Sequence, residues 1–243
     1  MSSKSESSQV QHLLVFTRYP EPGKTKTRLI PALGAAAAAD LQRQMTEHAI
    51  AQVRLLQTTQ PALSVTVWFA GGDTDGNTDY RSLLKDWLGE LNYQTQSTGD
   101  LGARLIEATQ SAFEAGATEV VIIGTDCPGV DALCLTVAFT ALKTADVVLG
   151  PATDGGYYLI GLRFSHVPDA PVGYTSHALK SRGERFSQLV PALFSNIAWS
   201  TSEVFQQTVA IAHSLNLTIA YLDPLTDVDR PEDVAVWEAI RDG

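Results

Sequence analysis

The chain of 243 residues carries a net charge of −10 at neutral pH, and 44% of its residues are hydrophobic, which suffices for a buried core in one large domain or two small ones. The acidic balance argues against a nucleic-acid partner, because a nucleic-acid backbone is bound by an extended positive surface. The polar, Ser-rich start and the short apolar run after it argue against a signal peptide or a membrane span. We therefore expect a cytoplasmic protein without a membrane partner, with a disordered tail over residues 1–10 and a single domain over residues 11–243.

Short β-rich segments alternate with longer segments of helical period along the chain. In the first half we predict strands near residues 12–17, 63–70, 91–96 and 119–125, and helices over residues 37–56, 80–88 and 100–116. In the second half we predict a helix near residues 130–143, strands near residues 146–150, 157–162 and 217–222, a helix from the capping box Ser200-Thr-Ser-Glu203 to about residue 216, and a last helix after Pro231. Residues 164–196 have no regular pattern, and we expect loops and at most one helix there.

This alternation predicts an α/β fold, a single three-layer α/β/α domain with a mostly parallel central sheet. No internal repeat and no break in composition divides the chain further. The sequence does not indicate an oligomeric state.

The loop from Arg18 to Arg28 holds four of the 17 Lys and Arg residues of this acidic chain. It follows a predicted strand and precedes a long helical segment, a junction at which α/β folds commonly bind phosphates. The run Gly23-Lys24-Thr25 is not a P-loop, because Arg18 stands where that motif needs its first glycine. A solvated surface loop is the alternative, but such a concentration of positive charge in an acidic protein favours an anion site.

Acidic residues follow three other predicted strands, namely Asp126, Asp154 and the pair Asp227 and Asp229. Because the carboxyl ends of parallel strands line one edge of a sheet, we expect these residues to meet the basic loop there. Carboxylate oxygens can hold Mg²⁺ or Mn²⁺ while the phosphates of a nucleotide supply the remaining ligands.

Each of these residues also has a structural interpretation. Asp126 could cap the helix after Pro128, and Asp154 could form a turn with Gly155 and Gly156. Asp227 and Asp229 could favour the N-terminus of the last helix. We prefer the functional interpretation because all four fall at the same predicted edge.

Other residue types give weaker signals. The five histidines have no metal-ligand spacing, and only His166 and His177, in the irregular segment, are placed to touch a substrate. Trp199 suits packing, with the lining of an acceptor pocket as the alternative. A nucleophilic hydrolase is not supported, because no Gly-x-Ser-x-Gly elbow occurs and Cys127 has no evident partner base.

Five segments occur in order between residues 13 and 240: Pro20-Glu-Pro-Gly-Lys-Thr-Lys-Thr-Arg-Leu29, Gly99-Asp-Leu-Gly-Ala-Arg-Leu105, Gly124-Thr-Asp-Cys-Pro128, Ala152-Thr-Asp-Gly-Gly-Tyr-Tyr-Leu159 and Asp227-Val-Asp-Arg-Pro-Glu-Asp233. Together they resemble a bacterial glycosyltransferase-like family of the GT-A, or nucleotide-diphospho-sugar transferase, superfamily. Members of that family are sometimes labelled for arsenosugar biosynthesis. The first and last segments also resemble phospholactate guanylyltransferases and molybdenum-cofactor nucleotidyltransferases.

The resemblance implies that Asp126 and Asp229 bind the metal, Mg²⁺ or Mn²⁺. Two features depart from the wider pattern, because Arg230 stands where relatives often have Thr and a single Asp replaces the Asp-x-Asp of many GT-A glycosyltransferases. The residues expected to bind the nucleotide and its phosphates are Arg18, Gly23, Lys24, Lys26, Arg28, Gly99, Asp100, Gly102, Arg104 and Thr125. The acceptor side is expected to comprise Asp154, Gly155, Gly156 and Trp199.

Two reactions fit these residues. In glycosyl transfer, a small-molecule acceptor attacks the anomeric carbon of a nucleotide sugar, and Asp154 orients or deprotonates the acceptor. In nucleotidyl transfer, a phosphorylated substrate attacks an NTP and pyrophosphate leaves, with Lys24, Lys26 and Arg28 stabilising the phosphates. The family resemblance favours the first reaction and the dense basic loop favours the second. We expect glycosyl transfer, with nucleotidyl transfer as the alternative and a non-catalytic nucleotide-binding module as a third possibility.

Overall fold

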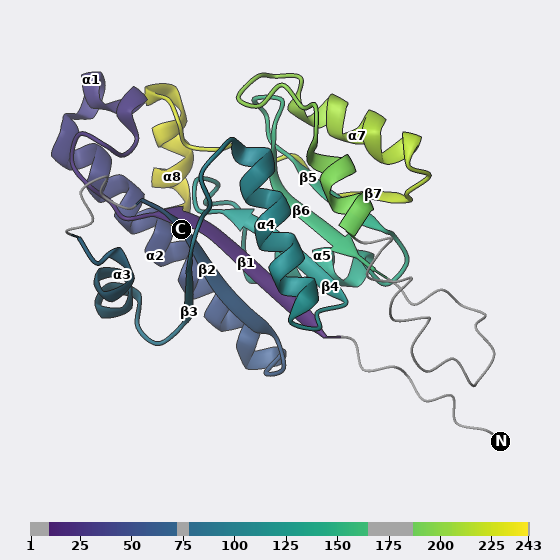
Figure 1. The fold of residues 1–243 in the computed structure, drawn as a ribbon. Helices are drawn as coiled ribbons and strands as arrows, with labels where there is room; N and C mark the ends of the chain where they lie inside the picture. Colours follow the sequence, from purple (N-terminus) through teal and green to yellow (C-terminus); the bar gives the residue numbers. More distant parts are fainter. Residues whose placement is uncertain (1–9, 72–77, 165–186, 243) are drawn as a thin grey trace, which may run out of the picture.

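The computed structural model describes residues 10–71, 78–164 and 187–242, which form one sheet between two layers of helices (Figure 1). The strands are β1 (Gln11–Arg18), β2 (Ser64–Ala70), β3 (Asn92–Thr95), β4 (Glu119–Gly124), β5 (Val147–Pro151), β6 (Tyr157–Arg163) and β7 (Ile219–Tyr221). The α-helices are α1 (Ile30–Leu33), α2 (Ala35–Thr59), α3 (Tyr80–Leu88), α4 (Leu101–Glu114), α5 (Ala132–Ala141), α7 (Val204–Ser214) and α8 (Val234–Arg241). Two 3₁₀ helices, η1 (Thr27–Leu29) and η2 (Pro231–Asp233), precede α1 and α8, and residues 187–194 are also helical.

The seven strands lie in the order β3-β2-β1-β4-β6-β5-β7. Four neighbouring pairs are parallel, and only β6 runs antiparallel to its neighbours β4 and β5. The predicted three-layer fold with a mostly parallel sheet is therefore confirmed, and each predicted strand is present within two residues of its expected bounds. The parallel strands place the loops after β1 and β4 at one edge of the sheet.

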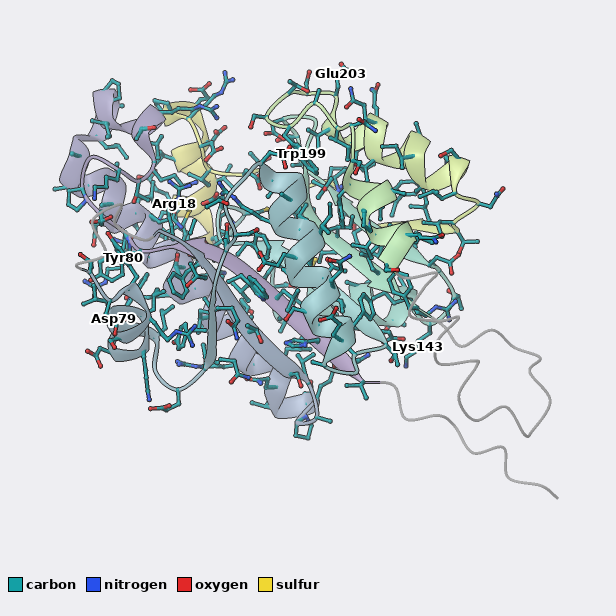
Figure 2. All side chains as sticks on the ribbon, viewed as in Figure 1. Arg18, Asp79, Tyr80, Lys143, Trp199 and Glu203 are labelled. Carbon is teal, nitrogen blue, oxygen red and sulfur yellow. The ribbon has the colours of Figure 1, made fainter. Side chains whose placement is uncertain are left out.

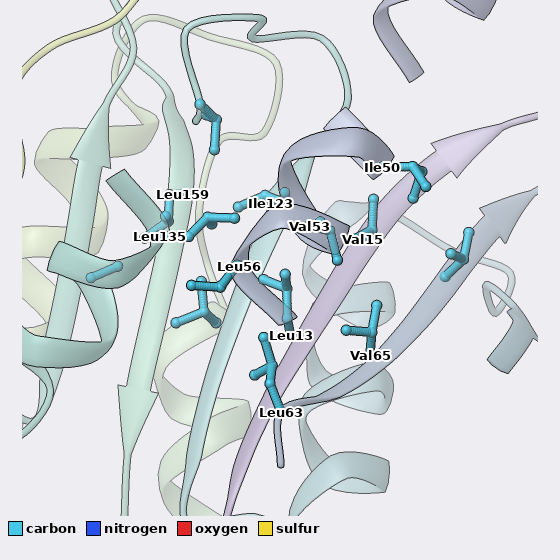
Figure 3. Close-up of a cluster of buried hydrophobic side chains, with 14 of the residues drawn as sticks. Leu13, Val15, Ile50, Val53, Leu56, Leu63, Val65, Ile123, Leu135 and Leu159 are labelled. Atoms are coloured by element: carbon cyan, nitrogen blue, oxygen red, sulfur yellow. The ribbon is translucent and has the colours of Figure 1, made fainter. Parts of the chain in front are cut away.

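The core has two main clusters because successive residues of a strand point to opposite faces. On one face, Leu13 and Val15 of β1 pack with Val53 of α2 and Leu135 of α5 (Figure 3). On the other face, β1 contributes Leu14, which belongs to a cluster with residues of α4, α7 and the helical residues 187–194. None of the helices in the described ranges is long and apolar enough to cross a bilayer.

A third, smaller cluster packs the C-terminal segment against η1 and α2. Leu29 and Met45 pack there with Val228 and Trp237 of the segment around α8. The Trp237 indole N–H also donates a hydrogen bond to Gln44 Oε1 at 3.3 Å. This cluster brings the segment before α8 to the loop after β1.

The helix predicted to begin at the capping box Ser200–Glu203 starts later than expected. Helix α7 begins at Val204, and its N-cap Glu203 makes no side-chain capping bond. Thr201 instead donates to the Ala198 carbonyl at 2.7 Å and accepts the Glu203 N–H at 3.3 Å, so these residues form a turn. The turn packs against Gly155, whose carbonyl accepts the Phe205 N–H at 2.9 Å, and this tertiary contact outweighs the local capping pattern.

Part of the predicted N-terminal tail and of the irregular segment lies outside the described residues. Residues 1–9 and both His166 and His177 fall there. Val10 is described, and its N–H donates to Thr118 Oγ1 at 3.0 Å.

Helix α5 is capped by Asp131, which accepts the Cys134 N–H at 2.7 Å. The cap that the sequence offered at Asp126 is therefore supplied five residues later. Replacing Asp131 by Ala should lower the free energy of unfolding by about 1 kcal/mol, because an orphan helix N–H loses its acceptor. Urea denaturation measures this loss. Asp131→Asn, which keeps the acceptor, should unfold close to wild type, and an equal loss in both variants would contradict the capping role.

Three of the site glycines, Gly23, Gly99 and Gly155, have positive φ, and Gly23 and Gly155 differ most in their surroundings. Gly155 has φ +92° and lies so close to the Ser202 backbone that an added Cβ would collide with it, whereas Gly23 has φ +85° and open space around it. Alanine in a left-handed conformation costs about 1–2 kcal/mol. Overpacking typically adds about 1–3 kcal/mol.

Gly155→Ala should therefore destabilise the protein clearly more than Gly23→Ala. Thermal unfolding of the two variants measures the difference. Equal losses of stability would show that the turn after β5 moves away from Ser202 without cost.

Candidate active site

A cleft with a volume of about 280 Å³ opens at the carboxyl edge of the sheet. Its walls come from the ends of β1 and β4, the start of α4 and the first residues of β6. Polar and charged residues in the lining are Thr17, Arg18, Gln42, Gln96, Arg104, Thr125, Asp126 and Asp227. The cleft thus has arginines from two segments together with carboxylates from two others.

Lys26 lies between the two carboxylates that the sequence assigns to a metal. Its Nζ is 2.8 Å from Asp126 Oδ1 and 2.7 Å from Asp229 Oδ1. Only 4% of the Lys26 side chain is exposed, against 49% for Asp126 and 40% for Asp229. Burial alone would lower the pKa of Lys26, but the two carboxylates outweigh it and raise that pKa above its usual value, so the side chain is an ammonium at neutral pH.

Local structure places these three side chains. Lys26 has a left-handed backbone, φ 49° and ψ 46°, and its carbonyl accepts the Leu29 N–H at the start of η1. The Asp126 carbonyl accepts the Val228 N–H at 2.8 Å, which joins the loop after β4 to the segment before α8. In that segment Asp233 accepts the Asp229 N–H at 3.2 Å.

Asp227 belongs to the same acidic group, as its place after the last strand predicts, although the metal was expected on Asp229 and not on Asp227. Burial first, and then the charges of three neighbouring carboxylates, raise the pKa of Asp227 to about 7. These neighbours are Asp126, Asp154 and Asp229. The signal in the sequence that Asp227 belongs beside Asp229 was their spacing of two residues, because alternate residues of an extended segment share a side.

The remaining cations of the basic loop lie at the rim. Arg18 lines the cleft, and one of its guanidinium N–H groups donates to the Lys24 carbonyl at 3.4 Å (Figure 2). Lys24 pairs with Glu21 at 3.3 Å, and Arg28 lies 3.6 Å from Asp229. The structure therefore brings the basic loop and the carboxylates together, as the sequence predicts.

The segment at the start of α4 forms another wall. Asp100 caps α4 by accepting the Ala103 N–H at 2.9 Å, and Arg104 donates to the Gly99 carbonyl at 3.0 Å. The buried Arg104 Nε has no hydrogen-bond partner among the described residues, which leaves a donor for a ligand in this wall. Leu101 also lines the cleft and is 40% exposed.

Thr125 is buried beneath the site. Its hydroxyl lies 3.0 Å from Thr17 Oγ1 and accepts the Gln42 side-chain N–H at 2.9 Å. Gln42 and Thr17 line the cleft and gave no signal in the sequence, because single polar residues in a strand and a helix are common. This network supports the turn that carries Asp126.

Of the residues expected on the acceptor side, Asp154 lies near the acidic group, whereas Trp199 lies outside the lining of the cleft. Asp154 accepts the Gly156 N–H at 2.9 Å in the turn with Gly155. Its negative charge is one of those that raise the pKa of Asp227. Trp199 lies above the start of α4, where its indole packs against Gly102, and its ring centroid is 6.5 Å from that of Tyr157 (Figure 2). Tyr157 lines the cleft, whereas Trp199 is not among the lining residues.

The donor set around Lys26 fits a hard divalent cation. Two carboxylate oxygens already converge on one cationic atom, and Mg²⁺ in proteins commonly takes one or two carboxylates and completes its shell with water and phosphate oxygens. Within the described ranges no group of three or more His, Cys, Asp or Glu side chains is arranged as a complete metal site. A metal here would therefore depend on ligands from the substrate.

Residues 53–201, more than half of the chain, match a family described as "Uncharacterized protein conserved in bacteria (DUF2064)". No curated protein matches the chain. Among solved structures, this chain is similar to a protein from Desulfovibrio desulfuricans G20 that carries the provisional name nucleotide-diphospho-sugar transferase. The two share 31% identity with a TM-score of 0.77, covering 94% of this chain and 86% of that one.

A second solved structure is 4-diphosphocytidyl-2C-methyl-D-erythritol synthase from Anaerococcus prevotii DSM 20548. It has 9% identity and a TM-score of 0.57, covering 97% of this chain and 100% of that one, a likeness of fold alone. These matches confirm the resemblance read from the five sequence segments. The chain therefore belongs to the DUF2064 family of bacterial proteins, and its fold is that of the nucleotide-diphospho-sugar transferases.

Proposed function

We propose that this protein is a transferase that transfers a glycosyl group from a nucleotide sugar to a small-molecule acceptor. The observation that carries the proposal is the cleft at the carboxyl edge of the sheet, where Arg18 and Arg104 line the same space as Asp126 and Asp227. An anionic ligand and a cation can be held there together. The name of the relative from Desulfovibrio desulfuricans G20 supports a nucleotide sugar as the donor.

In this proposal Arg18 and Arg104 bind the nucleotide through charge-assisted hydrogen bonds, and the orphaned Arg104 Nε finds its acceptor there. Asp126 and Asp229 would hold Mg²⁺ or Mn²⁺, which when bound would neutralise negative charge on the diphosphate. The acceptor hydroxyl forms a bond to the anomeric carbon as the bond from that carbon to the diphosphate oxygen breaks. Asp154 orients the acceptor and takes its proton.

Nucleotidyl transfer is the second candidate, favoured by the four cations between residues 18 and 28. It ranks second because two of those cations are already committed to carboxylates. Lys26 contacts Asp126 and Asp229, and Arg28 contacts Asp229, so less positive charge remains for a transferring triphosphate.

A panel of nucleotides and nucleotide sugars, each with and without Mn²⁺, distinguishes the two reactions. We expect a nucleotide sugar with Mn²⁺ to raise the melting temperature most, because a ligand at about a hundred times its Kd stabilises by roughly 2.7 kcal/mol. Release of the nucleoside diphosphate in the presence of candidate acceptors then reports glycosyl transfer. Pyrophosphate release from an NTP would reject it in favour of nucleotidyl transfer, and tight binding without either product would indicate a non-catalytic module.

Asp126→Asn should abolish the stabilisation that Mn²⁺ adds to nucleotide binding, because a carboxylate ligand is lost. The ligand-free variant should stay folded and lose no more than about 1 kcal/mol, since the Asp126 carboxylate is half exposed and Lys26 keeps its contact with Asp229. Differential scanning fluorimetry measures both quantities. Asp86→Asn, which removes the same charge from the exposed part of α3, is the control. Retention of the full Mn²⁺ effect in Asp126→Asn would give Asp126 a structural role only.

A further inference from the structure

Lys26 differs from the other cations of its loop in where its charge is placed. The Lys24 and Arg28 side chains are 64% and 67% exposed, whereas that of Lys26 is 4% exposed. Lys26 also has positive φ, which non-glycine residues adopt at a cost and keep only where the surroundings impose it. Contacts with Asp126 and Asp229 are the interactions that hold its ammonium inward.

The ammonium and a divalent ion would compete for the same two carboxylate oxygens. The two Oδ1 atoms of Asp126 and Asp229 lie 2.8 Å and 2.7 Å from Nζ, so Nζ lies between them. A divalent ion that takes the same two oxygens as ligands, at about 2.1 Å from each, would bring a second positive charge against the Lys26 ammonium. Repulsion between like charges and competition for the same two oxygens then disfavour Lys26 in its present position.

We propose that Lys26 is a built-in competitor of the divalent metal, an ammonium that neutralises Asp126 and Asp229 in the ligand-free protein and must leave before the metal binds. The inference rests on the metal-dependent function proposed above and adds a residue that sets metal affinity.

Replacing Lys26 by Met tests the competition directly. The variant keeps the length and apolar stem of the side chain but removes its charge, so Asp126 and Asp229 lose their neutralising partner. We expect Mn²⁺ to bind Lys26→Met more tightly than wild type, by on the order of tenfold, a typical size for coupling between two sites. The electron paramagnetic resonance signal of free Mn²⁺ measures the affinity without any assay of activity.

Lys85→Met is the matched control, because it removes the same charge at an exposed residue of α3 that is paired with Glu90. Its Mn²⁺ affinity should stay within about twofold of wild type, as screening weakens exposed charges. Unchanged or weaker Mn²⁺ binding in Lys26→Met would overturn the competition while leaving the metal site intact. Absence of Mn²⁺ binding in every variant, with and without nucleotide, would overturn the competition and also remove the metal from the proposed function.

A measurement on the wild type covers the case in which Lys26→Met does not fold. Acetylation by an N-hydroxysuccinimide ester, followed residue by residue by mass spectrometry, reports how accessible each lysine is. Mg²⁺ should increase the acetylation of Lys26 several-fold and leave that of Lys24 unchanged. Equal acetylation of Lys26 at zero and saturating Mg²⁺ would show that the ammonium does not move, and would reject the proposal.

Discussion

The contact of one buried ammonium with two carboxylates joins three distant parts of the chain. Lys26 follows β1, Asp126 follows β4 and Asp229 precedes α8, and the first and last of these are 203 residues apart. A charged group that is nearly all buried must be paired, so the position of each segment constrains the other two. The cleft exists in its observed form because these three segments meet at one edge of the sheet.

Apolar packing, more than the ion pairs, brings the segments together. Ion pairs with half-exposed partners contribute about 0–1 kcal/mol. Burial of one large apolar side chain contributes about 1.5–3 kcal/mol, and the cluster of Leu29, Met45, Val228 and Trp237 buries four of them beside the site. The charges therefore determine the chemistry of a site whose position packing has already fixed.

The site concentrates opposite charges in a protein whose net charge is −10. Asp227 has three carboxylate neighbours, those of Asp126, Asp154 and Asp229, and burial first and then their charges raise the pKa of Asp227 to about 7. Carboxylates grouped so closely repel one another, so the group does not stabilise the fold by itself. An additional cation would relieve the repulsion, and the arginines across the cleft would then attract an anion such as a phosphate.

The sequence by itself determined the fold and the convergence of the basic loop with the carboxylates. Alternating strand and helix periods predicted a mostly parallel sheet, and Asp residues after three strands predicted their convergence with the basic loop, because both rules depend on local pattern and on chain direction. Only the tertiary structure decided which side chains touch. It placed Lys26 between Asp126 and Asp229, gave the cap of α5 to Asp131, started α7 after the predicted capping box, and put Tyr157 rather than Trp199 in the cleft. These outcomes depend on burial and on contacts between residues far apart in the chain, for which local sequence carries no signal.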